Sequence, residues 1–282
     1  MLASTAGLAQ APVWQIDEIA AHRGQSDNRN KAYFSNRFQA LRSLLHQAPL
    51  ESSGDNSYII SLPMPDGSRS RFSIIESPVM AKALADKFPE IRTYRVFGVD
   101  DSAASGRLDI TPRGFHAMFN TSRGRVTIDP EADLYRVKWQ KGGDGGNGFQ
   151  CGTESLAARG DTGISGESTS STSSTSGSLA ARSAGNIQVY RLAVSATVEY
   201  VTAVGGGTLE GAMAEIVTAV NRINAIYERD LGIRLQLVAN NDQLIELDGS
   251  PRASPTNLDN NSLSALLGQN QNWIDFIIGS TS

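Results

Sequence analysis

The stretch TLEGAMAEIVTAVNRINAIYERDLG, residues 208–232, decides the fold of the second half of the chain. Its apolar residues recur at spacings of three and four, and its charged residues take the other side. This pattern predicts an amphipathic helix with one buried face. Thr208 can cap the start of the helix, and Gly232 can end it in a left-handed conformation.

The segments around this helix predict a β-α-β-α order. Residues 187–200 form a nearly continuous apolar and β-branched run, which is typical of a strand covered on both faces. A second strand is predicted at 233–239 and a second helix at 262–278. Strand, helix and strand in succession favour parallel pairing of the two strands. Because 96 residues are few for a complete α/β domain, we expect this domain to continue beyond Ser282.

The chain before residue 142 has a different pattern. A helix is predicted at 30–46 and a short helical piece at 79–88. Between and after them, short extended runs alternate with turn sequences such as Pro65-Asp66-Gly67 and Pro112-Arg113-Gly114. Tight turns join antiparallel neighbours, so this part is predicted to be an antiparallel sheet with one or two covering helices. The predicted fold class is thus an antiparallel-rich α+β unit followed by an incomplete α/β unit.

Residues 142–186 predict a linker between the two units. Of the 14 residues from Ser165 to Ser178, 13 are Ser, Thr or Gly, and such a sequence cannot bury enough apolar area to offset the entropy of ordering it. The charge also changes there: from Ile187 onward the chain has five Arg, no Lys and ten Asp or Glu. We therefore predict boundaries at 1–11, 12–141, 142–186 and 187–282.

Composition excludes several classes of protein. A net charge of −4 argues against a general nucleic-acid binder, which needs a basic surface. No run of about 18 apolar residues is present, so no membrane span is expected. Residues 1–11 are mostly small and apolar and end in Ala9-Gln10-Ala11, a pattern that signal peptidases cut after, but they lack a basic region. They fit either an ordinary N-terminus or the tail of an export signal.

Candidate binding motifs are weak when taken one at a time. The turn at Gly205-Gly206-Gly207 lacks the spacing of a dinucleotide or phosphate loop, so a plain strand-to-helix turn is the better interpretation. The histidines His22, His46 and His116 are too far apart to share a helical face, and each is expected to be a surface or core residue. A group of acidic and amide residues offers oxygen donors for calcium, although turn chemistry explains it better; it comprises Asn240, Asn241, Asp242, Asp248, Asp259, Asn260 and Asn261.

Cys151 is the single cysteine and lies within the predicted linker. A thiolate is a strong ligand for zinc, and a mobile segment could carry it to a metal site on the neighbouring domain. The alternative is an incidental cysteine without a role.

Two blocks of sequence resemble the precursors of bacterial reprolysin-like zinc metalloproteases of the metzincin clan. The first resembles the beginning of their catalytic domain and comprises VYRLAV at 189–194, GGT at 206–208, VNRIN at 220–224, YERD at 227–230, LVANND at 237–242 and GQNQ at 268–271. The second resembles their propeptide and comprises LPMPDG at 62–67, ESPVM at 76–80, FPEI at 88–91 and TPRGFHAM at 111–118. The zinc motif of the family, H-E-x-x-H-x-x-G-x-x-H, is absent from the sequence, so no catalytic residue can be assigned.

The resemblance implies a secreted or extracellular precursor, periplasmic in transit, that hydrolyses peptide bonds of protein or peptide substrates once it is complete. In that family zinc activates a water molecule, and the propeptide contacts the catalytic domain and blocks the site until the linker is cut. By this resemblance Cys151 becomes the candidate inhibitory zinc ligand, and Arg159 and Arg182 become candidate processing points. This chain alone is expected to be inactive. Two other classes remain open: a secreted binding or inhibitory module that never had a zinc motif, and a cytosolic α/β protein that binds a small ligand at Gly205–Gly207.

Overall fold

The structure is a computed structural model that describes residues 13–17, 31–140, 187–248 and 263–279. Nine of the described strands form one antiparallel sheet with the order β1-β2-β9-β8-β7-β6-β5-β4-β3. They are β1 (Trp14–Ile16), β2 (Lys31–Asn36), β3 (Tyr58–Pro63), β4 (Arg69–Glu76), β5 (Arg92–Gly98), β6 (Ser105–Thr111), β7 (Gly114–Thr121), β8 (Gly124–Glu131) and β9 (Leu134–Gln140). Consecutive strands from β3 to β9 are neighbours; short turns join most of them, the connection between β4 and β5 contains helix α3 (Lys82–Ala85), and β2 pairs with β9.

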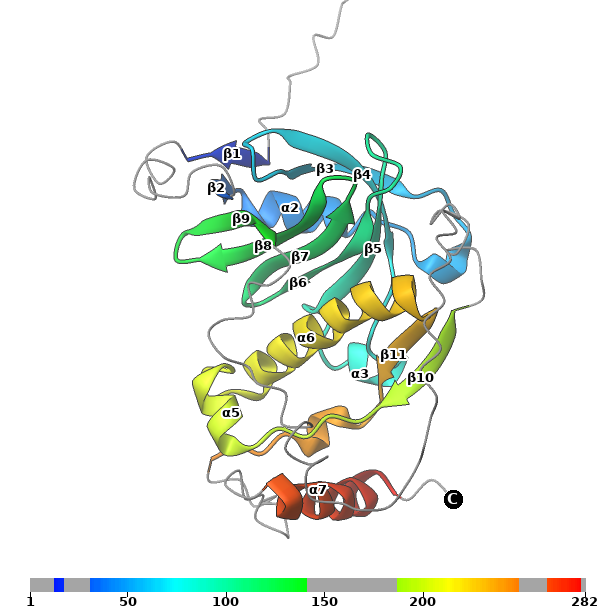
Figure 1. The fold of residues 1–282 in the computed structure, drawn as a ribbon. Coiled ribbons are helices and arrows are strands. Elements are labelled where there is room, and N and C mark those ends of the chain that lie inside the picture. The colour runs from blue at the N-terminus through cyan, green and yellow to red at the C-terminus, as the bar shows by residue number, and fades with distance from the viewer. Residues whose placement is uncertain (1–12, 18–30, 141–186, 249–262, 280–282) are drawn as a thin grey trace, which may run out of the picture.

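The two faces of this sheet differ in character because successive side chains of a strand point to opposite faces. On one face, Leu108 and Ile110 of β6 join a buried apolar cluster. Helix α2 (Phe38–Leu45) covers this face with Leu41 and Leu45, and lies behind the sheet in Figure 1. The other face carries polar side chains and meets the second half of the chain.

Within the described residues, the second half contains a small parallel sheet and three α-helices. Strand β10 (Gln188–Leu192) pairs in parallel with β11 (Ile233–Leu237). The helices are α5 (Val198–Ala203), α6 (Leu209–Asp230) and α7 (Leu263–Ile278), and a 3₁₀ turn covers Asn241–Leu244. Figure 1 shows α6 between the large sheet and the β10–β11 pair, with α7 at the far end of the molecule. The chain thus has an α+β arrangement.

Helix α6 begins and ends as the sequence predicts. The hydroxyl of Thr208 accepts a hydrogen bond from the backbone N–H of Gly211 at 3.1 Å, and Gly232 follows the helix with a φ of 67°. The prediction of this helix and of the parallel strand pair is therefore confirmed.

Three sequence predictions are wrong in detail. Residues 31–36 are a strand and only 38–45 are helical, because Ala32 and Phe34 alternate inward before the helical spacing begins. The run at 187–200 is not one buried strand: β10 ends at Leu192 with Val189 and Tyr190 more than half exposed, and α5 starts at Val198. The glycines at 205–207 therefore join two helices. The helical piece predicted at 79–88 is confined to α3 (Lys82–Ala85).

The two halves also meet at the outer edge of β11. The connection between β4 and β5 carries Met80, which forms a parallel bridge with Leu237. Helix α3 follows this bridge directly. Upstream residues thus contact both α6 and the small sheet.

Candidate functional site: the polar interface between the sheet and helix α6

Strand β6 places two charged residues opposite α6. Arg107 and Asp109 alternate with the apolar residues Leu108 and Ile110, so both charges point to the polar face of the sheet. Each is only 1% exposed. Fully buried charges are rare unless they are paired, so their partners decide what this interface does.

Asp109 binds α6 through side-chain hydrogen bonds. It accepts from the hydroxyl of Thr218 at 2.8 Å and from the amide Nδ2 of Asn221 at 3.0 Å. The ring Nδ1 of His116, on β7, lies 3.1 Å from the same carboxylate. Three partners satisfy this buried carboxylate, and two of them come from the helix.

Arg107 joins the same helix to the β4–β5 connection. Its Nε donates to the Oδ1 of Asn221 at 2.6 Å, and its Nη1 donates to Glu228 at 2.5 Å. Its Nη2 donates to the backbone oxygen of Ser77 at 2.6 Å. Burial lowers the pKa of Arg107 to about 10, and the charges of Arg234 and Arg95 act in the same direction. Asn221 therefore bridges Arg107 and Asp109 with its two amide atoms.

Arg107 belongs to a network of three guanidinium groups and two carboxylates. Glu228 binds Arg107, Arg95 at 3.1 Å and Arg234 at 2.5 Å. Glu51 binds Arg95 at 2.5 Å and Arg234 at 2.7 Å. Burial opposes ionisation of Glu51, but hydrogen bonds from Arg234 and Ser77 and the charges of Arg234 and Arg95 lower its pKa to about 2. The network carries one net positive charge, and it ties β5 and β6 to α6 and β11.

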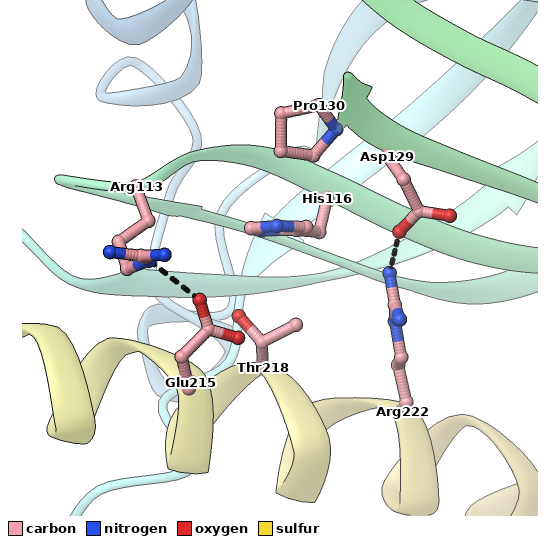
Figure 2. Close-up of a pocket in the computed structure, with 7 residues that line it drawn as sticks. All are labelled: Arg113, His116, Asp129, Pro130, Glu215, Thr218 and Arg222. Atoms are coloured by element: carbon pink, nitrogen blue, oxygen red, sulfur yellow. Dashed lines mark hydrogen bonds and ion pairs between the residues drawn. The ribbon is translucent and has the colours of Figure 1, made fainter. Parts of the chain in front are cut away.

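Beside this network, a cavity of about 300 Å³ opens between the sheet and α6. Figure 2 shows the residues that line it, with His116 and Thr218 in the middle and an ion pair on either side. Arg113 pairs with Glu215 at 2.7 Å, and Arg222 pairs with Asp129. Both pairs cross from the sheet to the helix, so the positive and negative charges of the cavity wall are already matched with each other.

The described residues do not form a zinc site. Within the described ranges, no group of three or more His, Cys, Asp or Glu side chains is arranged to hold a metal ion. His116 faces Asp109, which also binds two residues of α6. The arrangement is suited to holding two parts of a chain together.

The structure places some of the sequence candidates and leaves others outside the described residues. His116 is buried and His46 is exposed at the end of α2, as expected of core and surface residues. Asn241 is fully buried, and its side chain bonds both backbone groups of Val194, at 2.8 and 3.2 Å. Residues 241–244 form a 3₁₀ helix, and the amide of Asn241 is occupied by the distant Val194, not by the backbone of its own turn. The candidates His22, Cys151, Arg159, Arg182, Asp259, Asn260 and Asn261 lie outside the described residues.

The sequence prediction missed the residues that make the interface. Alternation of Arg107, Leu108, Asp109 and Ile110 normally indicates a strand with one face in water. On the helix, Asn221 is an amide residue that the structure shows to be only 1% exposed. The amide of Asn221 can bond both charged side chains of β6, but the sequence does not show that the helix and the strand meet.

One comparison with known proteins finds a likeness, and it covers the C-terminal third of the chain. Residues 186–280 match the family described as metallo-peptidase family M12B, reprolysin-like. Neither the curated proteins nor the solved structures yield a match. No described helix is both long and apolar enough to cross a membrane. The part of the chain that contributes α5, α6, β10, β11 and α7 is therefore similar to a reprolysin-like metallopeptidase region.

Proposed function

We propose that the chain is the N-terminal part of a secreted zinc metalloendopeptidase precursor, in which the nine-stranded sheet is the propeptide. In this proposal residues 187–282 are the first part of a metzincin-like catalytic domain, whose zinc ligands lie elsewhere in the complete protein. The bound zinc would activate water for peptide-bond hydrolysis in protein or peptide substrates. The sheet unit would keep the region latent until the linker at 142–186 is cut.

One observation carries the proposal. The matched region is joined to the sheet by buried hydrogen bonds: Arg107 donates to Asn221 and Glu228 of α6, and Asp109 accepts from Thr218 and Asn221 of the same helix. Exposed ion pairs contribute little to binding, but breaking a buried, hydrogen-bonded charge pair costs several kcal/mol. Such an interface can survive cutting of the linker, as a latent precursor requires.

The test is to cut the linker and ask whether the two parts stay together. A recognition sequence for a specific protease is inserted after residue 165, and the purified chain is cut. We expect the two pieces to elute together in size-exclusion chromatography at micromolar concentration. The variant Asp109→Ala/Asn221→Ala should elute as two separate pieces after cutting. If the two pieces of the cut wild-type chain elute separately, the proposal is contradicted.

A binding or inhibitory module without catalysis is the second candidate, because the buried interface would serve it equally well. The reading frame after Ser282 distinguishes the two. An encoded H-E-x-x-H motif supports the protease precursor, whereas a stop codon directly after Ser282 supports the module.

We also propose Cys151 as the inhibitory zinc ligand of the precursor. The test uses the complete precursor with Cys151→Ser. We expect early peptidase activity without linker cleavage, and unchanged latency would show that the thiol has no such role.

A further inference from the structure

The backbone at the outer edge of β11 donates and accepts hydrogen bonds with groups outside the small sheet. The side chain of Asn224, on α6, bonds both backbone groups of Leu235, each at 2.8 Å. Two residues further on, the N–H of Leu237 donates to the oxygen of Val79 at 2.7 Å, and its oxygen accepts from the N–H of Ala81 at 2.9 Å. The side chain of Asn224 thus satisfies the backbone groups of Leu235, and the extended segment around Met80 satisfies those of Leu237.

The segment that fills this edge also fills an apolar groove. Val79 and Met80 are 1% and 3% exposed. Leu84, Phe88 and Ile91 follow them and are buried in the same cluster. The groove side of this cluster is formed by residues of α6 and β11, namely Ala212, Met213, Ile216, Val217, Val220 and Leu237. An ion pair between Lys87 and Asp242, at 2.8 Å, lies at the side of the groove.

The filling segment is held in an extended form before it reaches β11. Pro78 has a fixed φ, and it favours an extended conformation for Ser77. The N–H of Val79 donates to the hydroxyl of Thr93 at 3.1 Å. The features recognised are therefore two adjacent apolar residues in extended conformation, followed by a short helical turn that presents further apolar side chains.

We propose that the β11 edge and the apolar face of α6 form a peptide-binding groove of the reprolysin-like region, which residues 79–91 occupy in this chain. Its ligand is a segment of a polypeptide partner with the same features. The inference rests on the proposed function, since the groove becomes free when the sheet unit leaves. A lipid or a small apolar molecule would leave both backbone groups of Leu237 without partners, whereas an extended peptide satisfies both.

The experiment opens the groove within the full chain. The variant Met80→Asp/Leu84→Asp places two charges at buried positions, so its own segment no longer fits. The matched control is Ala83→Asp/Pro89→Asp, because both of those positions in the same connection are exposed. The probe is a fluorescent peptide of residues 77–91, and its binding is followed by anisotropy. A second probe carries the Met80→Asp change.

We expect the opened variant to bind the first probe at least about tenfold more tightly than do the wild-type chain and the control variant. The second probe should bind none of them. If the opened variant does not fold, Ala81→Pro replaces it. The φ of Ala81 is −59°, which suits proline, so this change chiefly removes the N–H that bonds Leu237. Lys82→Pro, one residue later at an exposed position, is its control.

Equal binding of the first probe by a folded opened variant and by the wild-type chain would overturn the inference. So would a dimer of the opened variant that the probe does not dissociate, because the groove would then accept a second copy. Neither result touches the proposed function, which depends on whether the two pieces of the cut wild-type chain stay together.

Discussion

Replacing Glu228 should destabilise the protein more than replacing Arg107, although both lie in the same network. Glu228→Gln keeps the size of the side chain but leaves three guanidinium groups around one carboxylate, Glu51. Removing one partner of a buried ion pair typically costs about 3–5 kcal/mol. Arg107→Met instead leaves two guanidinium groups with two carboxylates, so charge is balanced. Its cost is that of unsatisfied acceptors on Asn221 and Ser77, about 1–3 kcal/mol.

The assay is urea unfolding of the full chain at neutral pH, followed by circular dichroism. Glu210→Gln is the matched control: Glu210 is an exposed residue of the same helix, and its loss should cost less than about 1 kcal/mol. The double variant Glu228→Gln/Arg107→Met should lose less unfolding free energy than the sum of the losses in the two single variants. The second change removes a charge that the first left unpaired. The charge argument is refuted if Arg107→Met costs as much as Glu228→Gln.

Three further results are expected. The pKa of Glu51 is lowered to about 2 from an ordinary 4.5, so the stability that its charge contributes is present above pH 4.5 and is lost as pH falls toward 2. In acid titrations the Glu51→Gln variant should lose stability less steeply over that range than the wild-type chain. Identical profiles of the two proteins would be contrary evidence. Asn224→Leu leaves both backbone groups of Leu235 unpaired and should cost about 2–4 kcal/mol in urea unfolding, whereas a cost below about 1 kcal/mol would not fit the geometry. Gly211→Ala places a Cβ 1.9 Å from the oxygen of Gly205 and should lower the Tm, while Gly268→Ala, with open space around it, should not; equal Tm values for the two would be inconsistent with this contact.

The sequence allowed the strands of the large sheet to be predicted where turn residues separated them. Turns such as Pro65-Asp66-Gly67 lie between β3 and β4, as the alternation of extended runs and turn residues predicts. The same reasoning failed at 30–46, because a period of two at Ala32 and Phe34 runs directly into a period of three and four. Without a turn residue at the junction, the two patterns read as one helix.

The interface could not be predicted because its energy lies in contacts between residues more than 100 positions apart. Each partner also has an ordinary explanation when it is taken alone. Arg107 and Asp109 fit a solvated strand face, and Asn221 fits the polar side of a helix. Only the packing of α6 across β6 shows that these three side chains satisfy one another. His116 was expected to be a core or surface residue, and the sequence could not show that it faces Asp109.

Asn224 also shortens the strand edge that β11 offers to other chains. An exposed strand edge invites pairing with further copies, which is how insoluble filaments begin. Because the amide of Asn224 already occupies the backbone of Leu235, departure of the sheet unit would uncover the backbone groups of Leu237 without extending the open edge to Leu235. An edge interrupted at Leu235 supports only short contacts, whereas a growing stack of strands needs a continuous run of open backbone groups.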